Sequence, residues 1–143
     1  MSRLVEHFDM VRLLFDFGLV ILIWMVQLVV YPSFRYYKKS DLMRWHERYT
    51  KAISIIVVPL MFGQLFLVIF QIVEVFDVVT ATLMGLVIAV WISTFAQFVP
   101  MHHAIAKGDL KDGLLRKLVR QNWLRTFLWS TILIIDATAV FYS

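Results

Sequence analysis

The chain has 143 residues, of which 61% are hydrophobic and only 17% are charged. Soluble domains are about half apolar and about a quarter charged, and a soluble fold of this length would leave much apolar surface in water. The composition therefore excludes an ordinary soluble domain and predicts a membrane protein. The chain has no cysteine, which excludes a disulfide framework, a thiol nucleophile and iron–sulfur ligation.

Uncharged runs predict where the chain crosses the membrane. A spanning helix needs about 20 mainly apolar residues, and the runs 17–34, 52–73 and 78–106 contain no charged residue. A fourth run, 123–142, contains Arg125 and Asp136, but Arg125 lies near its start, where a long side chain reaches the headgroups. We predict a single all-α transmembrane domain over residues 1–143, an antiparallel four-helix bundle. Its spans are expected at about 11–31, 50–73, 78–101 and 122–142.

The first helix is expected to be retained in the protein and to end at Tyr31. Acidic residues precede its apolar core and no small-residue cleavage site follows it, which is unlike a secretory signal peptide. Pro32 comes next, and the residue before a proline is disfavoured in a helix.

The other helices are delimited by polar and turn-forming residues. Ser40 or Asp41 is expected to cap the second helix, and Pro59 is expected to kink it. The short segment 74–77 allows only a tight turn, so the second and third helices should form a hairpin. Gly108-Asp109 and Asp112-Gly113 break the chain before the fourth helix. Small residues that permit close approach of helices are Gly18, Gly63, Gly85 and Ala89.

Lysine and arginine are distributed very unevenly around the predicted spans. The N-terminal stretch has Arg3 and Arg12, the second loop has none, and the first and third loops with their flanks have six each. Because such residues stay on the cytoplasmic side, we predict the first and third loops to be cytoplasmic and both termini non-cytoplasmic. The twelve residues are Arg35, Lys38, Lys39, Arg44, Arg48, Lys51, Lys107, Lys111, Arg116, Lys117, Arg120 and Arg125.

This bias also explains the net charge of +4, so no nucleic-acid partner is expected. We predict a multi-pass protein of the bacterial cytoplasmic (inner) membrane. Its expected partners are the lipid bilayer and, at the basic loops, anionic lipid headgroups. The sequence leaves open whether the chain forms a homo-oligomer or joins a larger membrane complex.

Polar residues inside spanning helices are costly and usually face the bundle interior. Many of those in this chain fall on common helical faces at 100° per residue, close to the predicted cytoplasmic ends. This group draws on all four helices and includes Arg48 and three of the four histidines, His46, His102 and His103. It is the candidate site, and its ligand-binding candidates are Trp24, Gln27, Tyr31, His46, Gln97, His102, Asn122, Arg125 and Trp129.

Several interpretations of these residues stay open at this point. The polar side chains can simply form interhelical hydrogen bonds, at about 0.6 kcal/mol each, and the histidines can bond headgroups. His46, His102 and His103 with Glu47 could hold a metal, or two imidazoles a haem iron. Arg125 among aromatic residues suggests an anionic or quinone-like headgroup, or else an ion pair with Glu47. No catalytic residue is predicted.

Two carboxylates, Asp16 and Asp136, lie at matching depths toward the other face of the membrane. They can share a proton, since burial raises the pKa of a carboxyl, and so serve a proton or cation relay. They can equally lie among the outer headgroups. A four-helix multidrug exporter also carries a carboxylate in its first helix, but the strong loop bias argues against that class.

Three motifs carry a resemblance to a family of bacterial four-helix integral membrane proteins that has no assigned activity. They are Trp24-x-x-Gln27-x-x-x-Tyr31-Pro32-x-Phe34, Pro100-x-His102-x-x-Ile105-x-x-Gly108 and Asn122-Trp123-x-Arg125-Thr126-x-x-Trp129. The resemblance covers most of the chain and implies the four-helix topology and the motif positions, without a chemistry. His103 is not part of the pattern.

The sequence therefore predicts a membrane protein that binds a small ligand or cofactor in the polar cluster at the cytoplasmic ends of its helices. One alternative is an accessory or scaffold subunit of a larger membrane complex. A second alternative is a haem-linked membrane oxidoreductase, which the chain is similar to in size. Those proteins carry a histidine inside a span, whereas the histidines here lie near the span ends. The sequence does not decide whether the protein is an enzyme.

Overall fold

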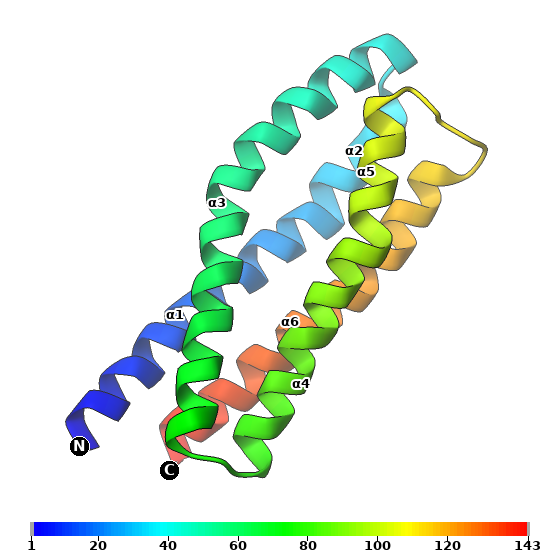
Figure 1. The fold of residues 1–143 in the computed structure, drawn as a ribbon. Coiled ribbons are helices and arrows are strands. Elements are labelled where there is room, and N and C mark those ends of the chain that lie inside the picture. The colour runs from blue at the N-terminus through cyan, green and yellow to red at the C-terminus, as the bar shows by residue number, and fades with distance from the viewer. Residues whose placement is uncertain (1, 143) are drawn as a thin grey trace.

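The computed structural model describes residues 2–142, and the side chains of residues 7–141. Its described part contains four long helices in an antiparallel bundle (Figure 1). The first and third helices are each made of several helical segments in continuous succession. In chain order the elements are α1 (Ser2–Met25), η1 (Val26–Val30), α2 (Tyr31–Ser33), η2 (Phe34–Tyr36), α3 (Lys39–Glu74), α4 (Val78–Ser93), η3 (Thr94–Phe98), α5 (Val99–Ala106) and α6 (Leu114–Tyr142).

Each of the four helices is long and apolar enough to cross a membrane, which confirms the predicted class of fold. The stretches that meet this condition are His7–Tyr36, Lys39–Glu74, Val78–Ala106 and Leu114–Phe141. They begin earlier or end later than the predicted spans because polar residues extend the helices beyond the apolar runs. The side chain of Arg3, which contributed to the charge count, lies outside the described residues.

The prediction that the first helix stops at Pro32 is wrong, because helical backbone continues to Tyr36. The reason lies in the preceding turn, η1, where the Tyr31 N–H bonds back five residues to the Val26 carbonyl. A proline in a regular helix strikes the carbonyl four residues before it and lacks the N–H that would bond to it. The wider turn adds a residue just before Pro32 and moves that carbonyl aside.

The third long helix repeats this arrangement. The Val99 N–H bonds back to the Thr94 carbonyl at the end of η3, and Pro100 follows in the first turn of α5. The two wide turns therefore lie at corresponding places in the two helices. Tyr31 directly follows η1, and His102 lies about one helical turn after η3.

The helix ends follow the sequence signals in part. The prediction of Ser40 or Asp41 as a cap is wrong: α3 begins at Lys39 after the extended residue Lys38, without a side-chain cap. The tight turn before α4 is as expected, and Asp77 caps that helix. Its carboxylate accepts the Thr80 N–H at 2.8 Å, and the Thr80 hydroxyl accepts the Asp77 N–H at 3.0 Å.

The break before α6 depends on two glycines with left-handed backbone. Gly108 has φ +70° and Gly113 has φ +84°, a region that residues with a Cβ rarely occupy. At Gly108 a Cβ would also lie 2.8 Å from the Met43 sulfur. The chain therefore turns sharply from α5 to α6, and α6 starts before the predicted residue 122.

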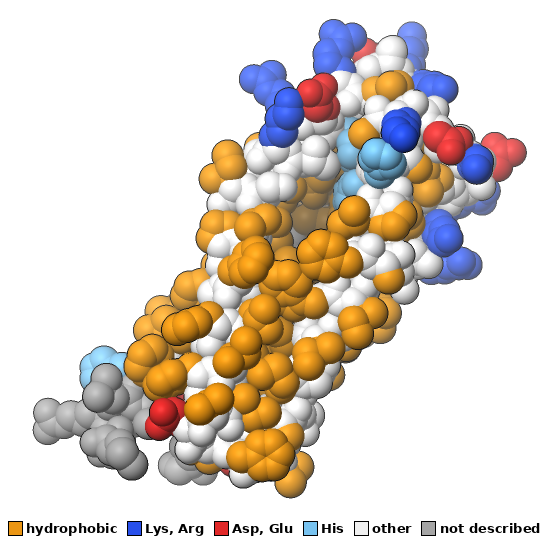
Figure 2. Space-filling model, in the orientation of Figure 1, with side chains coloured by type: hydrophobic (Ala, Val, Ile, Leu, Met, Phe, Trp, Pro, Cys, Tyr) orange, Lys and Arg blue, Asp and Glu red, His pale blue; other side chains and the backbone are white. Residues whose placement is uncertain are grey.

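The outer surface is apolar around the middle of the bundle (Figure 2). Lysine and arginine side chains gather at the end that carries the α2–α3 and α5–α6 connections, which we call the basic end. Both chain ends lie at the opposite end, beside the α3–α4 turn (Figure 1). The apolar belt between the two ends matches what a bilayer requires.

Two groups of buried side chains fill the interior. One occupies the middle of the bundle and includes Leu19, Val68, Val87 and Trp129. The second lies toward the basic end and includes Tyr31, Phe34, Leu42, Tyr49, Phe98, Met101 and Ile105.

Candidate functional site

A cavity of about 470 Å³ lies between α3 and the third long helix. Side chains of α1, η1, α2 and α6 form its inner wall, and in Figure 2 the hollow is visible below the basic end. Most of its lining is apolar. Its polar side chains include Tyr31, His46, His102 and Arg125, which come from all four helices.

Three of these side chains form a hydrogen-bonded row. The Tyr31 hydroxyl lies 2.9 Å from His102 Nε2, and His102 Nδ1 lies 2.8 Å from His46 Nε2. The two imidazole rings also stack, with centroids 5.0 Å apart. The row joins the end of the first helix to α5 and to the start of α3.

The row has a direction that depends on the histidine tautomers. If Tyr31 donates to His102, then His102 donates to His46, and His46 Nδ1 is left as a donor. If the order is reversed, His46 Nδ1 is left as an acceptor. In both cases this buried nitrogen has no hydrogen-bond partner among the described residues.

The two imidazoles do not fit a metal ion held between them. Zinc lies about 2.0–2.1 Å from a histidine nitrogen, so two ligating nitrogens need a separation well above the 2.8 Å between His46 Nε2 and His102 Nδ1. His103 is exposed, and Glu47 pairs with Lys51 at 2.7 Å. Within the described residues no group of three His, Cys, Asp or Glu side chains is arranged to hold a metal ion.

Arg125 lies at the inner wall of the cavity and is 7% exposed. Its guanidinium carbon is 4.3 Å from the Phe98 ring centroid and 5.0 Å from that of Trp129. The polar groups that interact with it include the Tyr31 and Tyr49 hydroxyls and the His102 ring. The expected ion pair with Glu47 is absent, and among the described residues Arg125 has no carboxylate partner.

The other predicted ligand-binding residues lie outside the cavity lining, and three of them, Trp24, Gln27 and Asn122, connect helices. Asn122 Nδ2 donates to Gln27 Oε1 at 3.0 Å, and Gln27 Nε2 donates to the Val119 carbonyl at 3.3 Å. Trp24 donates to Ser130 on α6 at 3.1 Å. Ser93 donates to Gln97 one turn on in the same helix, at 3.2 Å.

The structure therefore brings five of the nine predicted residues to the cavity: Tyr31, His46, His102, Arg125 and Trp129. Sequence reasoning missed Tyr49 and Phe98, which also line it. Tyr49 follows His46 by three residues, so helical periodicity pointed to it. Phe98 looks like any apolar residue of a span and gave no signal.

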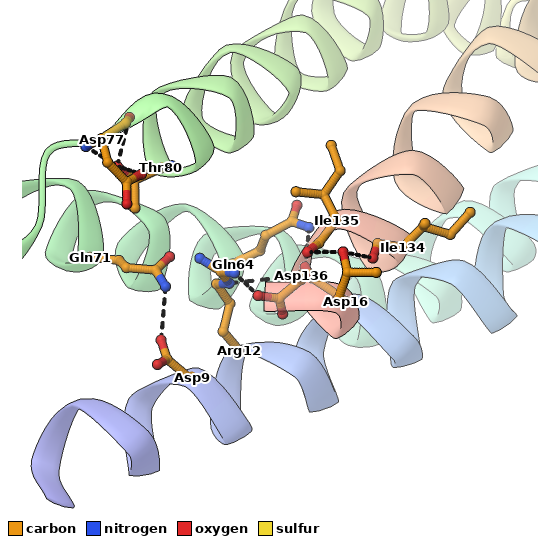
Figure 3. A network of polar contacts seen from close by, with 11 residues as sticks. Asp9, Arg12, Asp16, Gln64, Gln71, Asp77, Thr80, Ile134, Ile135 and Asp136 are labelled. Atoms are coloured by element: carbon orange, nitrogen blue, oxygen red, sulfur yellow. Dashed lines mark hydrogen bonds and ion pairs between the residues drawn. The ribbon is translucent and has the colours of Figure 1, made fainter. Parts of the chain in front are cut away.

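A second polar cluster lies deeper in the bundle, toward the chain ends (Figure 3). Asp16 and Asp136 are both 0% exposed, so neither lies among headgroups. They do not bond each other, because Arg12 lies between them. Arg12 forms an ion pair with Asp136, and its Nε is 4.0 Å from an Asp16 oxygen.

Gln64 connects this charged cluster to the cavity wall. Its Nε2 donates to Asp16 Oδ1 at 2.5 Å, and its Oε1 accepts the indole N–H of Trp129 at 3.2 Å. The sequence reasoning found Asp16, Gln64 and Asp136 but missed Arg12 as their partner. Arg12 was counted with the N-terminal stretch, at the outer edge of the predicted span 11–31, where a basic residue is ordinary.

The fold and the site together define a class: an all-helical protein with four helices long and apolar enough to cross a membrane, and a lined cavity near its basic end. Comparisons with protein-family models, with curated proteins and with solved structures gave no match.

Proposed function

We propose that this protein crosses the bacterial inner membrane four times and binds a small amphipathic molecule in the cavity. In this proposal the basic end is cytoplasmic and both termini are on the other side. The unequal distribution of lysine and arginine supports this orientation. The cavity would then lie in the cytoplasmic half of the bilayer.

The single observation that carries the proposal is the composition of the cavity. Ligand sites usually have volumes of about 300–1,000 Å³, with apolar walls and a few convergent polar groups. The cavity has about 470 Å³, and its polar groups include Tyr31, His46, His102 and Arg125. An amphipathic molecule has the matching chemistry: an apolar body and one polar head.

The position of the opening supports entry from the membrane. Several side chains of the lining are also exposed at the outer surface, between α3 and the third long helix. They are Ser54, Val58, Phe62, Phe95, Val99, His103 and Ala106. Because this surface belongs to the apolar belt, a molecule dissolved in lipid would reach the cavity sideways without passing through water.

The test uses a bulky residue at this opening. Val58→Trp is expected to obstruct the cavity, whereas Ile55→Trp on the same helix lies on the lipid-facing surface outside the lining. Each protein in phosphatidylcholine nanodiscs is incubated with 1-dodecanol, dodecanoate, dodecyl phosphate or decylubiquinone, and native mass spectrometry records the bound fraction. We expect at least one probe to bind the unchanged protein and Ile55→Trp and to be lost from Val58→Trp. Equal binding to all three proteins would contradict the proposal.

The role of an accessory subunit in a larger complex stays a prediction. Stoichiometric co-purification of other membrane proteins would support it.

A further inference from the structure

Two arginines are buried in the bundle, and their surroundings differ. Arg12 is 2% exposed and lies between the carboxylates of Asp16 and Asp136. Arg125 is 7% exposed, and its polar neighbours, which include the hydroxyls of Tyr31 and Tyr49 and the His102 ring, are uncharged groups. The protein thus balances the charge of one buried arginine and leaves the other without an anion in the described part of the chain.

An unpaired charge inside a bilayer is expensive, and such residues usually pair with another group or line a functional cavity. The rings of Phe98 and Trp129 offset part of this cost, since the face of an aromatic ring attracts a cation. They do not neutralise the charge. Arg125 Nε also lacks a hydrogen-bond acceptor in the described residues.

Arg125 faces the cavity, so a bound molecule can supply the missing anion. A planar guanidinium binds carboxylate and phosphate with two parallel hydrogen bonds. The Tyr49 hydroxyl interacts with the same guanidinium, and as a donor it can add a further bond to the head. A neutral quinone would leave the arginine charge uncompensated.

The apolar part of the lining extends from Arg125 toward the opening. Ile53 and Val57 on α3 face Trp91 and Phe95 on the third long helix across this space. An alkyl chain placed here would lead from the buried head to the lipid outside. The cavity therefore separates one positive group at its inner wall from an apolar path at its mouth.

We infer that the molecule bound in the cavity is an anionic amphiphile whose carboxylate or phosphate head pairs with Arg125, while its apolar chain passes between α3 and α4. This inference rests on the proposed binding function and specifies its ligand class. The same carboxylate or phosphate chemistry is also present in free anions that have no chain. The experiment therefore compares lipid-phase anions with free anions as the source of the head.

The experiment compares probes that share a chain and differ in the head. Dodecanoate, dodecyl phosphate, 1-dodecanol and dodecyltrimethylammonium are titrated at pH 8 into the protein in phosphatidylcholine nanodiscs, beside acetate and inorganic phosphate without a chain. Binding is followed by native mass spectrometry. We expect one or both anionic amphiphiles to bind at least about tenfold more tightly than dodecanol, since hydrogen bonds between two charged groups are stronger than those of a neutral hydroxyl.

Variants of the arginine assign this preference to its charge. Arg125→Gln is expected to lose the tenfold preference for the anionic probes while dodecanol still binds. Arg125→Lys is expected to keep a reduced preference because it keeps the charge. Arg120→Gln, an exposed arginine on the same helix, is the matched control and should behave like the unchanged protein.

Each other outcome contradicts a distinct statement. If dodecanol binds as tightly as the anionic probes, the proposed cavity function stands and the inferred head is wrong. If acetate or inorganic phosphate binds as tightly as the chain-bearing anions, the ligand is a free anion and the lipid-phase source is wrong. If no probe binds and Val58→Trp changes nothing, both the proposed function and this inference fail. If Arg125→Gln does not fold, the probe preferences of the unchanged protein and of Arg125→Lys still decide whether the bound head is anionic.

Discussion

Asp16 and Asp136 flank Arg12 in the interior, yet their contacts predict different roles. Asp136 forms the direct ion pair, whereas the carboxylate of Asp16 also accepts a hydrogen bond from Gln64. Removing one partner of a buried ion pair costs about 3–5 kcal/mol, because the other charge stays buried.

We therefore expect Asp136→Asn to lower the free energy of unfolding by about 3–5 kcal/mol. Asp16→Asn should cost clearly less, about 1–2 kcal/mol, because an amide can still accept the Gln64 hydrogen bond and Asp136 still balances Arg12. Unfolding in sodium dodecyl sulfate, followed by circular dichroism, measures both. Equal costs would show that Arg12 depends on both carboxylates alike.

The role of Asp77 as the cap of α4 predicts that the local stability of the α3–α4 turn depends on pH. The Thr80 backbone N–H that its carboxylate accepts holds the pKa of this exposed group below its usual value of 3.8. A depressed pKa in the folded protein means that the contribution of the cap is fully present above about pH 4 and is lost as the pH falls through the folded value. We expect the protection factor of the Thr80 amide, which compares its exchange rate with the intrinsic rate at the same pH, to fall below about pH 4.

Asp77→Asn is the control for this prediction, because asparagine keeps a capping acceptor and does not titrate. The protection factor at Thr80 in that variant should stay constant over the same pH interval. An identical profile in both proteins would contradict a role of the carboxylate.

At the scale of the elements, α1 and α3 meet closely where Gly63 faces the Phe15 ring. A Cβ at residue 63 would overlap that ring, whereas a Cβ at Gly85 on α4 would meet nothing within 4 Å. The small residues noted in the sequence are therefore not equivalent. Gly63 permits a close approach of two helices, and Gly85 lies in open surroundings.

Gly63→Ala is expected to lower the free energy of unfolding by about 1–3 kcal/mol, because overpacking forces the helices or the ring to move. Gly85→Ala is the matched control and should be neutral or stabilising by up to about 1 kcal/mol, since alanine has the higher helix propensity. The same detergent unfolding experiment compares them. A neutral Gly63→Ala would mean that Phe15 finds another rotamer at little cost.

The wide turns η1 and η3 also belong to the element scale. Sequence rules identify Pro32 and Pro100 as helix breakers, but each proline follows a turn that widens the helix and lets it continue. An extra residue in a helix rotates everything beyond it by about 100° relative to a regular continuation. Tyr31 and His102 stand just after these turns, so the turns decide that the two side chains meet.

At the scale of the whole molecule, the charge distribution predicts the orientation in the membrane. The chain has no cysteine, so single cysteines report accessibility without background. In intact bacterial cells we expect a membrane-impermeant maleimide to label Phe76→Cys, at the exposed α3–α4 turn, and not Lys111→Cys in the α5–α6 connection. Both should react after lysis. The reverse pattern in intact cells would overturn the proposed orientation.

The sequence allowed the class of fold to be predicted because hydropathy accumulates along the chain and does not depend on neighbours in space. The four spans, the hairpin turn and the two glycine breaks all follow from local composition. Helix ends were less predictable. Polar residues such as Lys39 in α3 and Arg116 in α6 can extend a helix outside the apolar run when no proline or glycine stops it.

The candidate site was predictable only in part, because a position on a helical face does not say which helix it meets. Periodicity and depth selected nine residues, and the cavity takes five of them; Gln27 and Asn122 instead bond each other across two helices. The ion pair of Arg12 was unpredictable for the same reason. Its partners Asp16 and Asp136 are 4 and 124 positions away, so only the packing of α1 on α6 brings the second one near.

The sequence by itself thus determined four helices long and apolar enough to cross a membrane, a basic end and polar residues close to it. The tertiary structure decided that His46 and His102 bond each other, that Arg12 is balanced by carboxylates and that Arg125 faces a cavity without one. The physical reason is that burial in lipid depends on the summed composition of a segment. Pairing of buried charges depends instead on the rotation and neighbours of each helix, which packing alone fixes.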